Sequence, residues 1–192
     1  MKYRIFFLLF IELFISCSKK ESKQPIDIFS LTLNSLDHNS YSLDELSKRK
    51  GAVIVFLQPE CPFCNSYGKT LKQLDSICIQ KRISFLGIVS GKNYSEAEIK
   101  TYLDKHHLTN PILLDPDFTL QKQLGATITP EAFLINNKGK MLYRGMIDNW
   151  GYEIGKVRAH VSDHYLLDAI EAYLQNKPIA PDSTKAIGCY IE

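Results

Sequence analysis

The chain has 192 residues, a length that suits one domain after removal of a leader, and 45% of them are hydrophobic, which is enough for a buried core. Its formal net charge of +2 is close to neutral, so the composition argues against a nucleic-acid partner. The chain carries five cysteines, whose meaning depends on where they stand in the sequence.

Residues 1–16 have the pattern of a secretory signal peptide. Lys2 and Arg4 precede an apolar stretch at residues 5–15, which is too short to span a bilayer as a regular helix. An uncleaved anchor is the alternative interpretation. Either arrangement places the domain in an oxidising compartment outside the cytosol.

A cysteine follows this apolar stretch directly. Residues 13–17 resemble the bacterial lipobox, which implies cleavage after Ser16 and lipidation of Cys17 as the new N-terminus. Residues 18–24 are polar and lysine-rich, as expected of a flexible tether. We therefore expect the chain to be divided into a signal peptide (1–16), a lipidated N-terminus and tether (17–25), one folded domain (26–176) and a C-terminal tail (177–192).

The first predicted elements of the domain are short. Alternating apolar and polar residues at 28–33 predict a half-buried strand, and Ser42 can cap a short helix at 43–47. The apolar run at 52–57 is rich in β-branched residues and predicts a fully buried strand. A helix is predicted to follow, from near Cys61 to about residue 79.

Two cysteines mark the start of that helix. Cys61 and Cys64 are three residues apart, so they share one face of the first turn and lie within disulfide reach. Pro62 suits the first helical position. The free N–H groups of the helix start favour a thiolate at Cys61, with a pKa in the range of about 3.5–7.5. We expect Cys61 to be the exposed nucleophile and Cys64 the buried resolving thiol of a redox-active disulfide.

This cysteine pair has two alternative interpretations. Half of a zinc site would need a second pair of ligands, but the adjacent His106 and His107 would point apart on a helix. A purely structural disulfide is the other alternative. A further cysteine, Cys78, lies at helical spacing from Leu71 and Leu74 and is expected to be a buried core thiol.

The rest of the domain alternates strands and helices, which implies βαβ crossovers and a largely parallel sheet. Ser95 and Glu98 form a capping box at the start of one helix, and Gly125 suits the end of another. A Lys-Gly turn between the last two apolar runs is typical of a hairpin. The predicted strands are 84–89, 112–114, 132–136 and 141–145, and the predicted helices are 95–106, 118–124 and 162–175.

The order strand, Cys-x-x-Cys, helix around Cys61 and Cys64 resembles the thioredoxin superfamily. The short N-terminal elements and the insertion between Val89 and Phe118 are similar to its TlpA-like and redoxin (AhpC/TSA-related) branch. The resemblance implies an α/β, thioredoxin-like three-layer fold. Its central, mostly parallel mixed sheet would be flanked by helices and would carry an N-terminal β extension and an inserted βα segment.

A second motif of the superfamily lies at residues 125–135. The resemblance implies that Pro130 is the cis-proline that faces the Cys-x-x-Cys motif, and that the backbone of Thr129 pairs with an extended substrate strand. An ordinary trans proline before a strand is the alternative. Thr129 and Pro130 are therefore the predicted substrate-binding residues.

The tail contains a fifth cysteine, Cys189. The chain is similar to a redoxin-like subgroup that ends in Gly-Cys-x-Ile, over three stretches: 129–133, 143–148 and 188–191. Many members of that subgroup lack the second cysteine of the pair, whereas this chain keeps Cys64. In such members a tail cysteine could resolve the mixed disulfide, so Cys189 is a candidate additional redox thiol. Alternatively, Cys189 packs under the domain or pairs with Cys78.

Three positions depart from better-known relatives. Val55 stands where thioredoxin has a buried acid, so proton transfer must use another group. Glu60 replaces the usual Trp before the first cysteine and is expected to be solvated. Gln58 stands where a peroxiredoxin needs Thr or Ser, which disfavours a peroxidase.

These features predict a membrane-tethered thiol–disulfide oxidoreductase, a lipoprotein that faces the periplasm in a bacterial cell envelope. It would exchange the Cys61/Cys64 dithiol with disulfides of exported proteins, and the TlpA-like resemblance favours reduction. We expect no cofactor, no metal and a monomer. One alternative is a copper-handling module similar to the Sco proteins, with His160 or His164 as a ligand, although the cysteine spacing is one residue short. A redoxin-type peroxidase is the other alternative.

Overall fold

The computed structural model describes residues 27–192. The predicted signal peptide, the lipidation of Cys17 and the predicted tether lie outside the described residues and stay predictions. Within 27–192, no helix has both the length and the hydrophobicity that crossing a bilayer requires.

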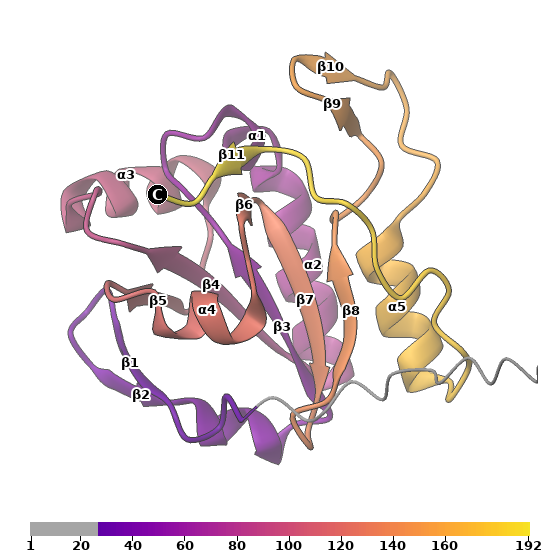
Figure 1. The fold of residues 1–192 in the computed structure, drawn as a ribbon, viewed down its shortest axis with the longest axis horizontal. Coiled ribbons are helices and arrows are strands. Elements are labelled where there is room, and N and C mark those ends of the chain that lie inside the picture. Colours follow the sequence, from indigo (N-terminus) through magenta and orange to yellow (C-terminus); the bar gives the residue numbers. More distant parts are fainter. Residues whose placement is uncertain (1–26) are drawn as a thin grey trace, which may run out of the picture.

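A seven-stranded mixed sheet forms the centre of the molecule (Figure 1). Its strands, in spatial order, are β2 (Ser40–Ser42), β1 (Thr32–Ser35), β5 (Ile112–Asp115), β4 (Ser84–Ser90), β3 (Gly51–Phe56), β7 (Glu131–Asn136) and β8 (Met141–Gly145). Strand β4 pairs in parallel with β3 and β5, and the other pairings are antiparallel. The expected α/β fold is confirmed, but the expectation of a mostly parallel sheet is wrong. Each edge of the sheet is an antiparallel hairpin, and each hairpin also pairs antiparallel with the neighbouring inner strand, β1 with β5 and β7 with β3.

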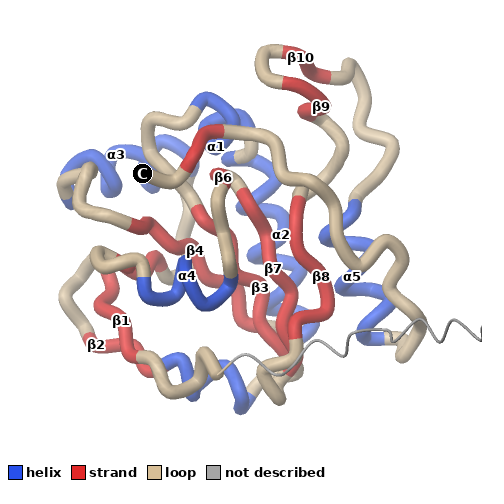
Figure 2. Tube along the Cα trace, viewed as in Figure 1, coloured by secondary structure: helices blue, strands red, loops and turns tan. Residues whose placement is uncertain are grey.

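Helices cover both faces of the sheet (Figure 2). Apolar residues of α2 (Gly68–Lys81), α3 (Glu96–His106) and α5 (Tyr165–Leu174) join the core on one face, and those of η1 (Leu43–Lys48) and α4 (Thr119–Leu124) join the core on the other. Strand β3 contributes to both cores: Val53 and Val55 lie in the first, and Ile54 and Phe56 lie in the second. Burial on both sides explains why the sequence of β3 is continuously apolar.

Local sequence motifs correctly predicted where several helices begin or end. The capping box of α3 is present, because the Ser95 hydroxyl accepts from the Glu98 N–H (3.3 Å) and the Glu98 carboxylate accepts from the Ser95 N–H (2.7 Å). Gly125 ends α4 with φ of 68°, a left-handed conformation that favours glycine. The predicted N-terminal β extension and the inserted segment, which contains α3 and β5, are both observed.

Most predicted elements agree with the structure to within one residue at each end, and three differ by more. Strand β1 begins at Thr32 rather than at residue 28, because the Leu31 N–H closes a turn onto the Ile28 carbonyl (3.1 Å). The single helix predicted over 61–79 is two helices, α1 (Pro62–Ser66) and α2, which meet at Tyr67. Helix α5 begins three residues later than predicted.

Tertiary contacts account for the two helical differences. The Tyr67 hydroxyl donates to the buried carboxylate of Asp148 (2.5 Å), which fixes the residue at the junction of α1 and α2. The residues before α5 are held out of the helix because the Ser162 N–H donates to the Asn149 side-chain oxygen (3.1 Å). Neither contact leaves a local sequence pattern.

The tail is more ordered than its sequence predicts. It first runs along β8, where the Arg144 carbonyl accepts from the Thr184 N–H (3.0 Å) and the Thr184 hydroxyl meets the Tyr143 hydroxyl (2.7 Å). It then crosses the end of the sheet as β11 (Cys189–Tyr190), the yellow strand of Figure 1, which pairs antiparallel with β6 (Ile128–Thr129). A small hairpin, β9 (Gly151–Glu153) and β10 (Lys156–Val157), projects beside it.

Candidate active site

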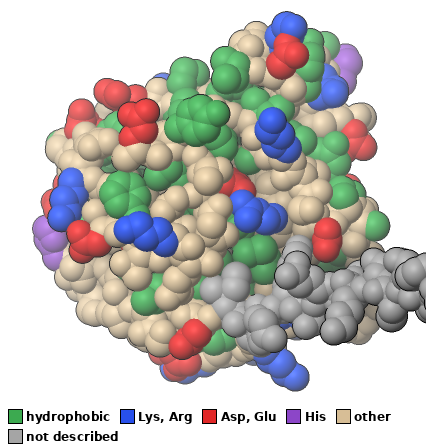
Figure 3. All heavy atoms as spheres, in the orientation of Figure 1, with side chains coloured by type: hydrophobic (Ala, Val, Ile, Leu, Met, Phe, Trp, Pro, Cys, Tyr) green, Lys and Arg blue, Asp and Glu red, His purple; other side chains and the backbone are tan. Residues whose placement is uncertain are grey.

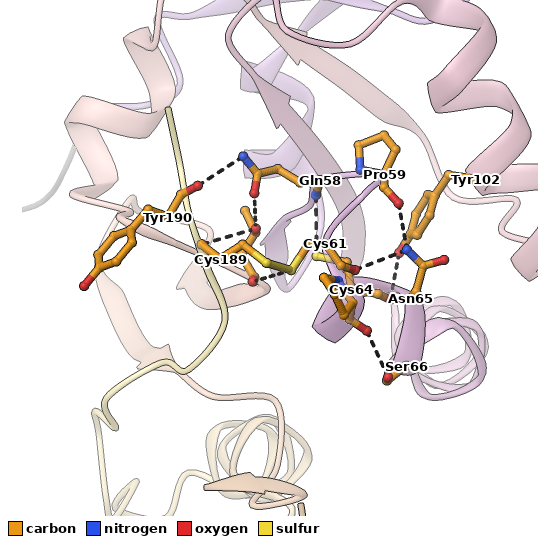
Figure 4. Close-up of a disulfide and its surroundings, with 11 residues drawn as sticks. Gln58, Pro59, Cys61, Cys64, Asn65, Ser66, Tyr102, Cys189 and Tyr190 are labelled. Atoms are coloured by element: carbon orange, nitrogen blue, oxygen red, sulfur yellow. Dashed lines mark hydrogen bonds between the residues drawn. A yellow bond between two sulfur atoms is a disulfide. The ribbon is translucent and has the colours of Figure 1, made fainter. Parts of the chain in front are cut away.

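Cys61 lies where the chain leaves β3 and enters α1. It is the N-cap of α1, with Pro62 at the first helical position, and its carbonyl accepts from the Asn65 N–H (3.0 Å). Its sulfur forms a disulfide with Cys189 of the tail, and the two Cα atoms are 6.0 Å apart (Figure 4). Only 2% of Cys61 is exposed. The expectation of an exposed Cys61 is wrong for this oxidised state, because the tail strand covers the sulfur.

Cys64, one turn further along α1, is a free thiol. The predicted disulfide between Cys61 and Cys64 is therefore not the one that this structure contains, and the resolving role of Cys64 stays a prediction. Cys64 is fully buried, as expected. Burial raises the pKa of its thiol to about 12, although the Gln58 N–H (3.4 Å from the sulfur) and the Thr129 hydroxyl oppose this shift. Cys64 is therefore protonated at neutral pH.

The bond between Thr129 and Pro130 is cis, as expected, and lies against the disulfide. The Thr129 carbonyl oxygen is 3.2 Å from the Cys61 sulfur, so it can accept a hydrogen bond from the Cys61 thiol only when the disulfide is reduced. Thr129 is 1% exposed. The strand that pairs with it here is the protein's own β11, in the place where the sequence predicts a substrate.

Gln58 is a site residue whose position the sequence did not predict. Its side-chain oxygen accepts from the Thr129 hydroxyl (2.7 Å), and its side-chain nitrogen donates to the Tyr190 carbonyl (3.2 Å). Its backbone N–H points to the Cys64 sulfur (3.4 Å). Figure 4 shows Gln58 between the tail strand and α1, so one residue contacts both the tail and the free thiol. The sequence indicated only that Gln58 replaces a peroxiredoxin hydroxyl.

The acids near this end of the sheet are engaged elsewhere. Glu131 is buried and forms an ion pair with Arg144 (2.7 Å). The buried Asp148 accepts from Tyr67, and burial together with this hydrogen bond raises the Tyr67 pKa above its usual range. Glu60 is exposed, as expected. The polar groups at the Cys64 sulfur are an N–H and a hydroxyl rather than a carboxylate, which agrees with Val55 in place of the acid.

The remaining candidate residues lie apart from this site. Cys78 is a fully buried free thiol in the core, as expected, and burial raises its pKa to about 12. Its alternative pairing with Cys189 is not observed, because Cys189 is bonded to Cys61. His160 and His164 are exposed. Among residues 27–192, no cluster of three or more His, Cys, Asp or Glu side chains is arranged to hold a metal ion.

Known structures share this fold. A hypothetical protein from Sinorhizobium meliloti is 22% identical, with a TM-score of 0.74, over 84% of this chain and 89% of that one. The pneumococcal exposed lipoprotein thioredoxin from Streptococcus pneumoniae is 21% identical, with a TM-score of 0.55, over 76% of this chain and 98% of that one. These similarities confirm the thioredoxin-like fold that the sequence motifs implied.

Sequence similarity points the same way. A "Thioredoxin-like protein" of Haemophilus influenzae is 26% identical over 132 residues, which are 68% of this chain and 75% of that protein. Residues 24–144 match the AhpC/TSA family. With the thioredoxin-like fold and a disulfide at the start of α1, these findings support an oxidoreductase that acts on thiols and disulfides. Since the family match spans more than half of the 192 residues, the chain belongs to the AhpC/TSA family.

Proposed function

We propose that the protein is a thiol–disulfide oxidoreductase whose Cys61 exchanges disulfides with exported polypeptides. One observation carries the proposal: Cys61, at the N-cap of α1 and 3.2 Å from the Thr129 carbonyl, is joined to a cysteine that reaches it on an extended strand. An extended segment paired with the residue before the cis-proline is the arrangement that a substrate disulfide needs. The docked tail supports the proposal, because it is an extended segment that carries a cysteine to Cys61.

The proposed cycle begins with reduction. A dithiol donor supplies two electrons to the Cys61–Cys189 disulfide and leaves two thiols. The Cys61 thiolate then attacks a substrate disulfide, and one substrate sulfur leaves as a thiolate. A second thiolate of the protein attacks the Cys61 sulfur, which releases the other substrate sulfur and restores a protein disulfide. The substrate has gained two electrons and the donor has lost two.

Cys189 and Cys64 both qualify for the second attack. Cys189 already forms the bond with Cys61 and belongs to a half-buried strand, whereas Cys64 has a thiol pKa of about 12 and needs a proton acceptor. We assign the first resolving step to Cys189. The Cys64 thiolate can then attack Cys61, release the Cys189 thiolate and move the disulfide to Cys61–Cys64, with no external oxidant.

The proposal includes the location inferred from the sequence. The signal-like residues 1–16, a lipidated Cys17 and the tether up to residue 25 would attach the domain to a membrane of the bacterial envelope, where it would act as a reductant and a monomer. A structural neighbour named as an exposed lipoprotein thioredoxin supports this location. Mass spectrometry of the mature N-terminus tests the anchor, and an unmodified Cys17 would contradict it.

The activity is tested by insulin reduction with dithiothreitol as donor. We expect turnover by the wild-type chain and a loss of at least about 10³-fold for Cys61→Ser, because the nucleophile is removed. Cys78→Ala is the matched control, since Cys78 lies in the core away from the site, and it should keep the wild-type rate. A Cys61→Ser variant that still reduces insulin would refute the proposal.

Peroxide reduction is a second candidate, which the AhpC/TSA membership favours. Peroxide would oxidise the Cys61 thiolate to a sulfenic acid, and attack by Cys189 would release water and form the observed Cys61–Cys189 disulfide. Hydrogen peroxide added to the reduced chain tests this route. The measurement compares the rate of Cys61–Cys189 formation in the wild-type chain and in Gln58→Thr. Stoichiometric formation that is faster in the wild-type chain would contradict the view that Gln58 disfavours a peroxidase.

A further inference from the structure

The tail strand displays how an extended segment sits on β6. Cys189 lies opposite Thr129 and Tyr190 lies opposite Ile128 in an antiparallel pair. The Ile191 N–H donates to the Thr127 carbonyl (3.0 Å), which continues the ladder by one residue. Bonds of this kind involve only the main chain of the docked segment, so they fix its direction and register without selecting its sequence.

The position before the reactive cysteine admits no side chain. A Cβ atom added to Gly188 would overlap the Thr129 carbonyl oxygen and would lie 2.8 Å from the Thr129 carbonyl carbon and 3.3 Å from Cγ2 of Ile128. The obstacle is backbone rather than a flexible side chain. Thr129 is 1% exposed and its hydroxyl is bound to Gln58, so this backbone cannot move aside freely. Only glycine fits at this position without displacing the site.

The two positions after the cysteine differ from each other. Tyr190 is 71% exposed, and Figure 4 shows its ring pointing away from the disulfide. Ile191 is partly buried and packs against the core cluster that lies under η1 and α4. This alternation is the normal consequence of an extended strand, whose successive side chains face opposite ways. The first position after the cysteine is therefore free, and the second requires an apolar side chain.

We propose that β6 and Cys61 form a binding site for extended polypeptide segments of the pattern Gly-Cys-x-aliphatic, and that residues 188–191 occupy it here as a built-in example. The proposal rests on the proposed exchange activity and adds the class of segment on which it acts. Gln58 also contacts the main chain of the docked segment, because its side-chain nitrogen donates to the Tyr190 carbonyl (3.2 Å). The Thr129 hydroxyl, which donates to Gln58 (2.7 Å), lies 3.4 Å from the Cys189 carbonyl.

The surroundings of this site suit a polypeptide. On the face shown in Figure 3, hydrophobic side chains gather near β11 and the β9–β10 hairpin. Tyr152 and Ile154 of that hairpin are 45% and 75% exposed, and they line a hollow of about 500 Å³ together with Ile187 and Tyr190. Charged residues also line this hollow, namely Glu131, Arg144, Glu153 and Lys185. A surface beside β11 with both apolar and charged side chains fits the mixed flanking residues of an extended protein chain.

Exchange with short peptides tests the pattern directly. In the full chain carrying Cys64→Ser, the thiolate of an added peptide attacks the Cys61 sulfur, the bond to Cys189 breaks, and Cys189 leaves as a thiolate. The product is a disulfide between Cys61 and the peptide, which intact mass spectrometry counts after an acid quench. The reference peptide is acetyl-Ala-Ile-Gly-Cys-Tyr-Ile-amide, which copies the tail.

Three peptides serve as comparisons, each normalised by its own exchange with oxidised glutathione. Replacing Gly by Ala, or the final Ile by Ser, should lower the equilibrium constant for capture by at least about tenfold, equivalent to about 1.4 kcal/mol. Replacing Tyr by Ser should change it by less than about twofold, because that position faces solvent. Equal capture of the Gly and Ala peptides would overturn the proposal.

A variant of the protein provides a second measurement. Gly188→Ala should lower the equilibrium constant for closing Cys61–Cys189 against glutathione by at least about tenfold, with an unchanged far-ultraviolet circular dichroism spectrum. Insulin reduction by the wild-type chain is measured alongside. If insulin is reduced but the peptides are captured equally, the segment pattern is wrong and the exchange activity stands. If the peptides are discriminated but insulin is not reduced, the binding site stands and the proposed activity fails.

Discussion

Cys64 and Cys189 are the two thiols that can pair with Cys61, and their surroundings are opposite. Cys64 is fully buried, the Tyr102 hydroxyl holds its carbonyl (3.1 Å), and burial raises its pKa to about 12. Cys189 is half-buried on a two-residue strand that main-chain hydrogen bonds hold in place. Cys64 has a fixed position in α1 but is hard to ionise. The bond between Cys189 and Cys61 forms only when the tail is docked on β6. Docking of the tail therefore determines whether Cys64 or Cys189 forms the disulfide with Cys61.

The largest expected effect is a complete change of disulfide pairing in Cys189→Ser. Without the tail thiol, mild oxidation should join Cys61 to Cys64, because the two lie one helical turn apart. Peptide mapping without reductant identifies the crosslink. Cys78→Ala is the control and should keep the Cys61–Cys189 bond. If oxidised Cys189→Ser contains no Cys61–Cys64 disulfide, Cys64 is only a core residue and is not a redox partner of Cys61.

A second prediction concerns pH. In Cys189→Ser, only Cys64 can release a substrate from Cys61, and its reactive form is the thiolate. Since burial raises the pKa of this thiol from 9.0 to about 12, its thiolate fraction should rise about tenfold for each pH unit between about pH 6 and pH 9. Stopped-flow release of a fluorescent peptide thiol measures the rate. A plateau near pH 7 would show that Cys64 ionises far more easily in the mixed disulfide.

The smallest of these effects is expected for Gln58→Ala. The variant loses the side-chain bonds to Thr129 and Tyr190 that help hold the tail. At about 1 kcal/mol for a typical hydrogen bond, the ratio of Cys61–Cys189 to Cys61–Cys64 should fall about five- to thirty-fold. Quantitative mapping of both disulfides in equilibrium with glutathione tests this. Gln123→Ala on the exposed side of α4 is the control. An equal change of the disulfide ratio in both variants would show that Gln58 does not hold the tail.

The elements that could be predicted are those that local sequence determines. The continuous apolar run of β3, the capping box of Ser95 and the turn glycines indicated most of the sheet and helices. The cis-proline followed from a family motif at Pro130. The sequence could also place Cys64 inside the protein, because it lies on the inward side of an N-terminal helical turn.

The pairing of Cys61 with Cys189 could not be derived in this way. The two residues are 128 positions apart, and the tail that carries Cys189 has no helical or strand periodicity. Its docking depends on main-chain bonds to β6 and on a close approach of Gly188 to Thr129. Such contacts leave almost no side-chain pattern, so resemblance to the Gly-Cys-x-Ile subgroup was the one signal available. Gln58 was missed because the partners of its side chain, Thr129 and Tyr190, are 71 and 132 residues away in the sequence.

The attachment of the tail along β8 has a further consequence for kinetics. Thr184 is anchored by the Arg144 carbonyl and the Tyr143 hydroxyl, and only four residues separate it from Cys189. A segment of that length spans at most about 17 Å. As long as the anchor holds, a reduced Cys189 stays within this radius, at an effective concentration in the millimolar range or above. A substrate polypeptide must therefore compete with the reduced Cys189 for Cys61. The lifetime of its mixed disulfide with Cys61 then depends on how stably Thr184 is anchored.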